Sequence, residues 1–196
     1  GGDDNLLTNN IVINGMSGIK PSINRALQNQ HIICVQFMGT MPKYTNEIKQ
    51  PNSIYSIEGY TLTSIVLYKG AHYISLCLRD NMWYVFDDNT GWAIPYKYTN
   101  RMTELLDHDC KLLMYSKNYD IAMPHTLYRP MVNVPNCANM CFINAVLHAL
   151  ITSYGYQNLI DYLTQLLDKT DDTYGTKIEE PDIALVTQTL EYIKFL

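Results

Sequence analysis

The chain has 196 residues, of which 47% are hydrophobic, a composition typical of a globular protein and not of a disordered one. Its net charge is −5 and it contains no basic run, which argues against nucleic acid or an anionic membrane as the main partner. No apolar stretch has the length of a membrane-spanning helix and no signal-peptide pattern is present, so the sequence predicts no membrane partner.

The five cysteines, at positions 34, 77, 110, 137 and 141, include no C-x-x-C pair and therefore predict no zinc ribbon. Their odd number and low density also argue against a disulfide framework. We therefore expect a reducing, intracellular setting, either cytoplasmic or nuclear. We expect no metal and no organic cofactor.

Turn residues and apolar runs predict a β-rich first part of the chain. Residues 1–20 are rich in Asn and Gly and are expected to form loops, whereas residues 21–27 predict a short capped helix. The polar residues 43–51 are expected to form a surface connection. Apolar runs rich in β-branched residues predict strands at 31–38, 61–68, 72–78, 82–86 and 111–115, with turns at Lys69-Gly70 and Asp80-Asn81.

The second part of the chain predicts helices. Residues 117–135 lose hydrophobic periodicity and contain three prolines, so they are expected to form a connector across the surface. Helices are predicted at residues 141–152, 157–168 and 181–195. Strands followed by helices indicate an α+β fold. We expect one catalytic domain with a β-rich half at 1–116, the connector at 117–135 and a helical half at 136–196.

The residues around Cys141 suggest a cysteine hydrolase. Cys141 begins an apolar helical run, and the positive end of a helix dipole favours the thiolate form of a cysteine. An asparagine a few residues upstream, as Asn136 and Asn139 are, can donate an amide N–H to a developing oxyanion. Such a site also needs a histidine base and a group that orients this base.

His72 and Asp87 are the candidates for these two roles. They lie at the outer ends of two predicted antiparallel strands joined by a tight turn, so the hairpin brings them side by side. A carboxylate there would bind one imidazole nitrogen and leave the other to face a thiol. Each residue also has a purely structural interpretation. Cys141 can be a small buried hydrophobe, Asp87 and Asp88 can form a hydrated turn, and the asparagines can be loop or cap residues.

Two longer patterns contain these residues. Residues 134–150 read Val-Pro-Asn-Cys-Ala-Asn-Met-Cys-Phe-Ile-Asn-Ala-Val-Leu-His-Ala-Leu and resemble the cysteine box of the ubiquitin-specific proteases, G-L-x-N-x-G-N-T-C-Y/F-M/I-N-S/A-x-L/V-Q-x-L. Residues 60–88 resemble the histidine box of this family at Tyr60, Leu62, Ile65, His72, Tyr73, Trp83, Phe86, Asp87 and Asp88. Residues 32–37 and 110–115 are similar to two further strands of the family.

The resemblance implies a papain-like fold and a thiol-dependent deubiquitinase. Such an enzyme hydrolyses the carbonyl of the C-terminal glycine of ubiquitin or a ubiquitin-like protein through a thioester. The resemblance implies that Cys141 is the nucleophile and His72 the general base. It implies that Asp87 orients His72, with Asp88 as the alternative for this third role.

Three further positions receive a role only from the resemblance. Asn136 matches the asparagine of the oxyanion hole, and Tyr73 and Asn139 are the implied substrate-binding residues. The chain departs from the family at Ala71 and Ala138, which stand where the family has glycines. It also lacks the zinc-binding fingers that grip the body of ubiquitin.

The order of the two boxes is reversed. Family members carry the cysteine first, whereas here His72 and Asp87 precede Cys141. The simplest explanation is a circular permutation in which the β-rich palm comes first and the helical thumb second, joined at residues 117–135. Catalytic triads are defined by geometry and not by chain order, so the reversal is no objection to activity.

Three functions are compatible with these observations. The leading hypothesis is an isopeptidase that acts on ubiquitin or ubiquitin-like conjugates, as a monomeric domain that can belong to a larger protein. The second is a protease that processes its own polyprotein, which the initial Gly1-Gly2 in place of Met suggests. The third is a catalytically silent ubiquitin-binding module, which the alanine replacements and the missing fingers support.

Overall fold

A computed structural model describes residues 10–14, 32–38, 41–79, 81–90, 94–95, 104–117, 140–168 and 180–195. In these ranges the chain forms one seven-stranded sheet in the order β1-β2-β7-β3-β4-β5-β6. The strands are β1 (Asn10–Asn14), β2 (Ile32–Met38), β3 (Tyr60–Lys69), β4 (His72–Arg79), β5 (Met82–Phe86), β6 (Ile94–Pro95) and β7 (Asp109–Lys117). Neighbouring strands are antiparallel, apart from the parallel pair β1 and β2.

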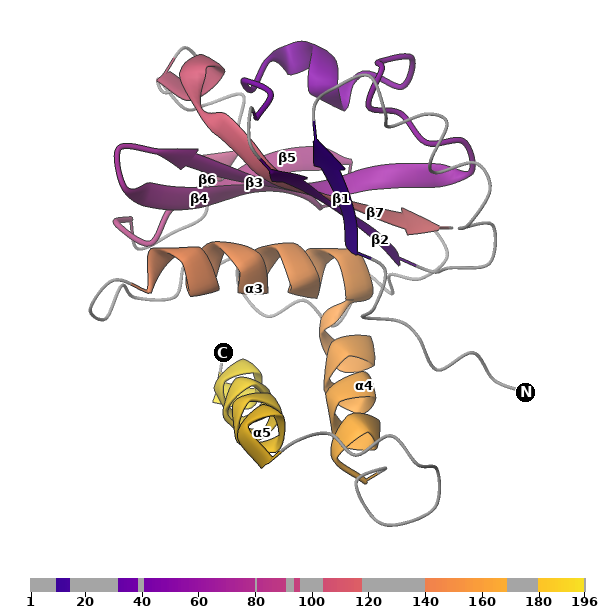
Figure 1. The fold of residues 1–196 in the computed structure, drawn as a ribbon, viewed down its shortest axis with the longest axis vertical. Coiled ribbons are helices and arrows are strands. Elements are labelled where there is room, and N and C mark those ends of the chain that lie inside the picture. The colour runs from indigo at the N-terminus through magenta and orange to yellow at the C-terminus, as the bar shows by residue number, and fades with distance from the viewer. Residues whose placement is uncertain are drawn as a thin grey trace.

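Three α-helices of the described chain follow the sheet in sequence. They are α3 (Cys141–Tyr154), α4 (Tyr156–Asp168) and α5 (Glu180–Phe195). Figure 1 shows α3 lying along one face of the sheet, with α4 and α5 beyond it on the same side. Two short 3₁₀ helices, η2 (Asn46–Lys49) and η5 (Glu104–Asp107), belong to the segments that cover the opposite face. No helix of the described ranges is long and apolar enough to cross a membrane.

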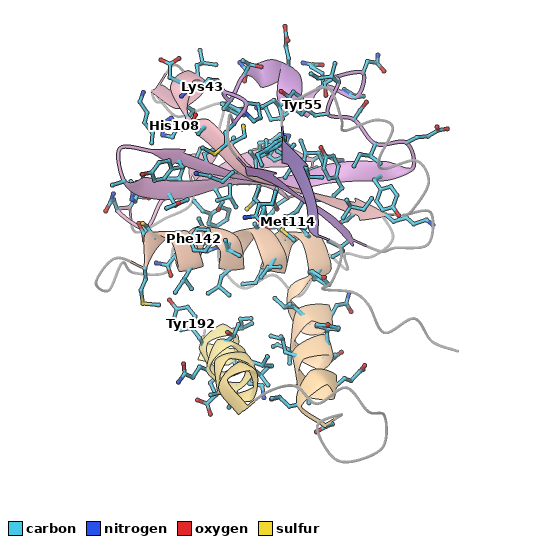
Figure 2. The ribbon with its side chains drawn as sticks, in the orientation of Figure 1. Lys43, Tyr55, His108, Met114, Phe142 and Tyr192 are labelled. Atoms are coloured by element: carbon cyan, nitrogen blue, oxygen red, sulfur yellow. The ribbon has the colours of Figure 1, made fainter. Side chains whose placement is uncertain are left out.

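Alternate residues of the central strands supply two hydrophobic cores. On β3, Ile65 and Leu67 join the core beneath η2 and η5, whereas Val66 joins the core beneath α3. Figure 2 shows Met114 of β7 between the sheet and α3, in this second core. Both faces of the sheet are therefore covered, as expected for strands that read as nearly continuous apolar runs.

Small hydroxyl side chains hold α3 close to β3 and β7. Ser153 Oγ lies 2.8 Å from Thr63 Oγ1, and Ser116 Oγ donates a hydrogen bond to the Ser153 carbonyl at 2.7 Å. Ser64 Oγ donates to the carbonyl of Ala149 at 3.2 Å. All of these groups are buried, so each hydrogen bond satisfies a polar atom that would otherwise be costly to bury. The network fixes the position of α3 along the sheet.

Two tight turns place the ends of β4. Lys69 pairs with His72, and the two residues between them have positive φ angles, 59° at Gly70 and 64° at Ala71. This is the backbone of a two-residue hairpin turn, in which the alanine pays a conformational cost that a glycine would avoid. Arg79 pairs with Met82 across the second turn, where Asn81 has a φ of 60°.

The structure confirms the α+β class, and the predicted strands and helices that fall on described residues are present, with ends that differ by at most two residues. One prediction was wrong, because residues 1–20 contain β1, in which the short apolar run Ile11-Val12-Ile13 pairs with β2. Residues 43–51 form the predicted surface connection, which contains η2 and the buried side chains of Tyr44 and Ile48. The predicted helix at 21–27 and the connector after Lys117 lie outside the described residues.

Candidate active site

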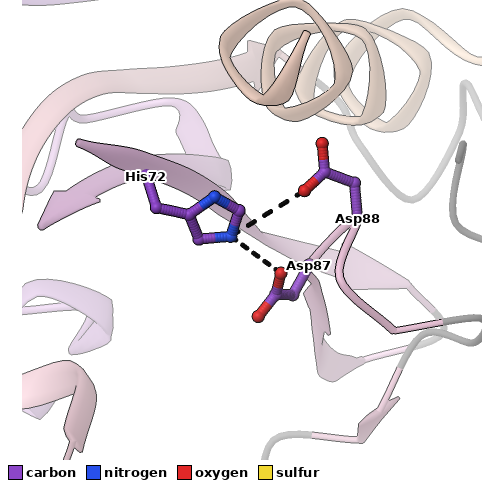
Figure 3. A group of neighbouring side chains, drawn as sticks. All are labelled: His72, Asp87 and Asp88. Atoms are coloured by element: carbon purple, nitrogen blue, oxygen red, sulfur yellow. Dashed lines mark hydrogen bonds and ion pairs between the residues drawn. The ribbon is translucent and has the colours of Figure 1, made fainter. Parts of the chain in front are cut away.

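The predicted contact between His72 and Asp87 is present. His72 begins β4 and Asp87 directly follows β5, and these two strands pair in an antiparallel hairpin. His72 Nε2 lies 2.8 Å from Asp87 Oδ1, as Figure 3 shows. The side chain of Asp87 is 4% exposed and that of His72 is 28% exposed. A buried carboxylate therefore holds an imidazole whose other edge can reach solvent.

This contact fixes the tautomer of His72. A carboxylate only accepts hydrogen bonds, so the 2.8 Å contact requires that Nε2 carries the hydrogen. Nδ1 of the neutral ring is then the basic nitrogen, available to a thiol. Asn89 supports the carboxylate, because its backbone N–H donates a hydrogen bond to Asp87 Oδ1 at 3.0 Å. The sequence alone indicated no role for Asn89.

Asp88 occupies a second position beside the same ring. Its Oδ1 lies 3.8 Å from His72 Nε2, and its Oδ2 accepts a hydrogen bond from Asn144 Nδ2 at 2.9 Å. The side chain is 3% exposed, and Oδ1 is buried without a hydrogen-bond partner. The distances favour Asp87 over Asp88 as the group that orients His72.

Cys141 lies at the N-terminus of α3, beside the residue that follows His72. The ring of the adjacent Phe142 lies 5.0 Å from the ring of Tyr73, at an interplanar angle of 71°. Burial raises the pKa of Tyr73, and the neighbouring Tyr68 and Cys141 raise it further. The structure thus places the start of α3 against Tyr73, the residue that follows His72. Among the described residues, however, no hydrogen bond joins Cys141 Sγ to His72.

The environment of Cys141 differs from that of the other described cysteines. Burial raises the pKa of both Cys34 and Cys110 to about 12 and also raises the pKa of Cys77. These three thiols are therefore poor nucleophiles at neutral pH. Among the described cysteines, Cys141 is the one that stands first in an α-helix. The first backbone N–H groups of a helix have no intrahelical partner. Such groups can stabilise a thiolate or an oxyanion.

Asn136 and Asn139 lie outside the described residues, so the oxyanion-hole and substrate-binding roles of these two positions stay predictions.

Asn144 belongs to the site, although the sequence alone did not identify it. It follows Cys141 by three positions, which places it on the same side of α3. This spacing of three residues in a predicted helix was the sequence signal that could have placed Asn144 near Cys141.

The same group of side chains could also bind a cation. Ligand atoms of His72, Asp87 and Asp88 lie within 4.8 Å of one another. Two carboxylates and one imidazole are common ligands of divalent metals. The 2.8 Å contact already explains the close approach of His72 and Asp87 as a hydrogen bond, so the geometry does not require a metal.

The assembled groups have a definite chemical capability. A thiol at a helix N-terminus, near a histidine held by a buried carboxylate, can attack a carbonyl with general-base assistance.

Comparison of the chain with protein-family models gives no match, and comparison with curated proteins gives none.

Proposed function

We propose that the protein is a cysteine isopeptidase that releases ubiquitin or a ubiquitin-like protein from its conjugates. The observation that carries this proposal is the hydrogen bond of 2.8 Å between His72 and Asp87, beside the helix that Cys141 begins. The two boxes that resemble the ubiquitin-specific proteases supply the substrate class. The proposal includes a papain-like fold in circularly permuted order, and activity in the cytoplasm or nucleus.

The proposed mechanism is acyl transfer through a thioester. His72 Nδ1 takes the proton of the Cys141 thiol, and the sulfur attacks the carbonyl carbon of the substrate's C-terminal glycine. The oxyanion receives hydrogen bonds from backbone N–H groups at the start of α3 and, by resemblance, from Asn136. The imidazolium then gives its proton to the leaving amine. His72 next takes a proton from a water molecule, which hydrolyses the thioester and regenerates the thiol.

The proposal requires His72 and Cys141 to come closer than they lie in the structure, since no hydrogen bond joins them there. Catalytic hydrogen bonds are often long in free enzymes and shorten when substrate binds. The surroundings of Cys141 suit a protein substrate. Phe142 and Ile143 are 49% and 48% exposed directly beside the thiol, and Tyr73 packs on Phe142. These two neighbouring side chains would offer a protein substrate an apolar surface next to the thiol.

Probes made of ubiquitin or a ubiquitin-like protein with a C-terminal electrophile test the proposal. We expect one adduct on the wild type, no adduct on Cys141→Ala and an unchanged adduct on Cys34→Ala. Cys34 is a matched control because it is a free, half-buried thiol whose pKa is raised to about 12. Absence of an adduct with every probe, or equal labelling of Cys141→Ala, would refute the proposed activity.

A second candidate function is a catalytically silent ubiquitin-binding module. It is supported by the absence of a hydrogen bond between Cys141 and His72 in the structure. This function predicts that the chain binds free ubiquitin but does not hydrolyse a C-terminal amide reporter. A hydrolysis rate that disappears in both His72→Ala and Cys141→Ala would exclude it.

A further inference from the structure

A chain of hydrogen bonds links the C-terminal helix to the candidate active site. Tyr192 of α5 donates its hydroxyl hydrogen to Asn144 Oδ1 at 3.3 Å, and Asn144 Nδ2 donates to Asp88 Oδ2 at 2.9 Å. The other oxygen of Asp88 lies 3.8 Å from His72 Nε2. Figure 2 shows Tyr192 at the end of α5 that lies next to α3. Residues from α5, α3 and the turn after β5 therefore form one chain of contacts that ends at the His72 imidazole.

The chemistry of these groups allows only one orientation of the Asn144 amide. The Asp88 carboxylate accepts hydrogen bonds and cannot donate, so the NH₂ group of Asn144 must face it. The amide oxygen then faces Tyr192, whose hydroxyl can donate to it. Asn144 is 2% exposed, so water cannot readily replace either partner. The tyrosine hydroxyl thereby favours the amide orientation that serves Asp88.

The position of Asp88 depends on this support. Its side chain is almost fully buried and Oδ1 accepts no hydrogen bond, so the bond from Asn144 to Oδ2 satisfies a carboxylate that would be costly to bury alone. With Oδ2 held, Oδ1 faces His72 Nε2. A carboxylate in this place stabilises the imidazolium that forms whenever His72 takes a proton.

We propose that Tyr192 is a positioning residue of the active site, which acts on His72 through Asn144 and Asp88. This inference rests on the proposed hydrolase function and adds to it a role for α5. Tyr192 touches neither the substrate nor the reacting atoms. Its hydroxyl instead holds the Asn144 amide, and without that hydroxyl the amide keeps only one of the two hydrogen bonds that fix it against Asp88.

The proposal is tested by the kinetics of three variants, Tyr192→Phe, Asn144→Ala and the double variant. The substrate is ubiquitin, or the ubiquitin-like protein that reacts with the wild type, carrying a C-terminal amide reporter. We expect Tyr192→Phe to lower kcat about three- to tenfold, the effect of one hydrogen bond, and to leave KM unchanged. In the Asn144→Ala background the same change should have no further effect on kcat, because the connection is already broken. Tyr162→Phe is the matched control, since Tyr162 lies in the same helical core, and its kcat should equal that of the wild type.

The outcomes separate this inference from the proposed function. If the wild type does not react, the hydrolase proposal fails, and the side-chain amide resonances of Asn144 decide whether the chain of hydrogen bonds exists. These resonances should shift in Tyr192→Phe and stay in place in Tyr162→Phe. If the wild type is active, a normal kcat for Tyr192→Phe, or equal losses in both backgrounds, would overturn the positioning role. Unshifted Asn144 resonances would overturn the hydrogen bond itself.

Discussion

His148 is a buried histidine whose titration should make the protein sensitive to acid. Its ring stacks on Phe86 with a centroid distance of 4.2 Å, and its Nε2 is buried without a hydrogen-bond partner in the structure. Burial, and then the neighbouring positive charge of Arg79, lower the pKa of His148 from 6.5 to about 3. The folded protein therefore keeps this ring neutral down to low pH, whereas the unfolded chain protonates it near pH 6.5.

The sign of the effect follows from proton linkage. Between the two pKa values the unfolded state binds more protons, so the free energy of unfolding falls as the pH falls. The contribution is fully present above pH 6.5 and is lost progressively toward pH 3. With these values, the change from pH 7 to pH 5 removes about 2 kcal/mol. For a chain of this length that corresponds to a decrease in Tm of about 4–8 °C.

The variant His148→Gln measures this contribution, because glutamine is polar but does not titrate. Glutamine is also the residue at this position of the cysteine box that the chain resembles. Thermal unfolding followed by circular dichroism from pH 7 to pH 5 should show a steeper loss of Tm for the wild type than for the variant. Other titrating groups affect both proteins equally, so the difference isolates His148. Parallel curves of Tm against pH would refute the reasoning, whatever the stability of the variant at pH 7.

Four further substitutions test the turn, the site and the interface beneath α3. Ala71→Gly should raise Tm by about 1–4 °C, because glycine relieves the positive φ, and an unchanged melting curve would contradict this. Asp87→Asn should lower kcat/KM by about 10²-fold or more and Asp88→Asn by about tenfold, and the reverse order would reassign the orienting role. Ser153→Ala should lower the free energy of unfolding by about 1–3 kcal/mol in urea denaturation, because Thr63 loses its 2.8 Å partner.

Local sequence signals were sufficient for much of the fold. The run from Thr61 to Phe86 combines β-branched residues with two turns, and it forms the predicted hairpins because turn chemistry and strand pairing act between near neighbours. The same locality explains why the contact between His72 and Asp87 was predictable. The position of Cys141 at a helix start followed from apolar periodicity.

Contacts between distant segments could not be read in this way. The short strand β1 pairs in parallel with β2, and nothing within residues 10–14 specifies that partner. Asp88 looked like part of a solvated turn, but Asn144 covers its carboxylate once α3 packs against the sheet. Tyr192 reaches the site because α5 packs on α4 and brings the tyrosine hydroxyl to Asn144, which lies 48 residues away in the chain.

The site therefore consists of two local units and one interface. The hairpin of β4 and β5 positions His72 against Asp87, and α3 presents Cys141 at its first residue. The packing of α3 on the sheet brings the hairpin and the start of α3 together. The hydrogen bond from Asn144 to Asp88 contributes to this interface. These contacts all join described residues outside the connector, so they do not themselves fix the order of the two units along the chain. A circular permutation that altered only the connector would leave these contacts unchanged.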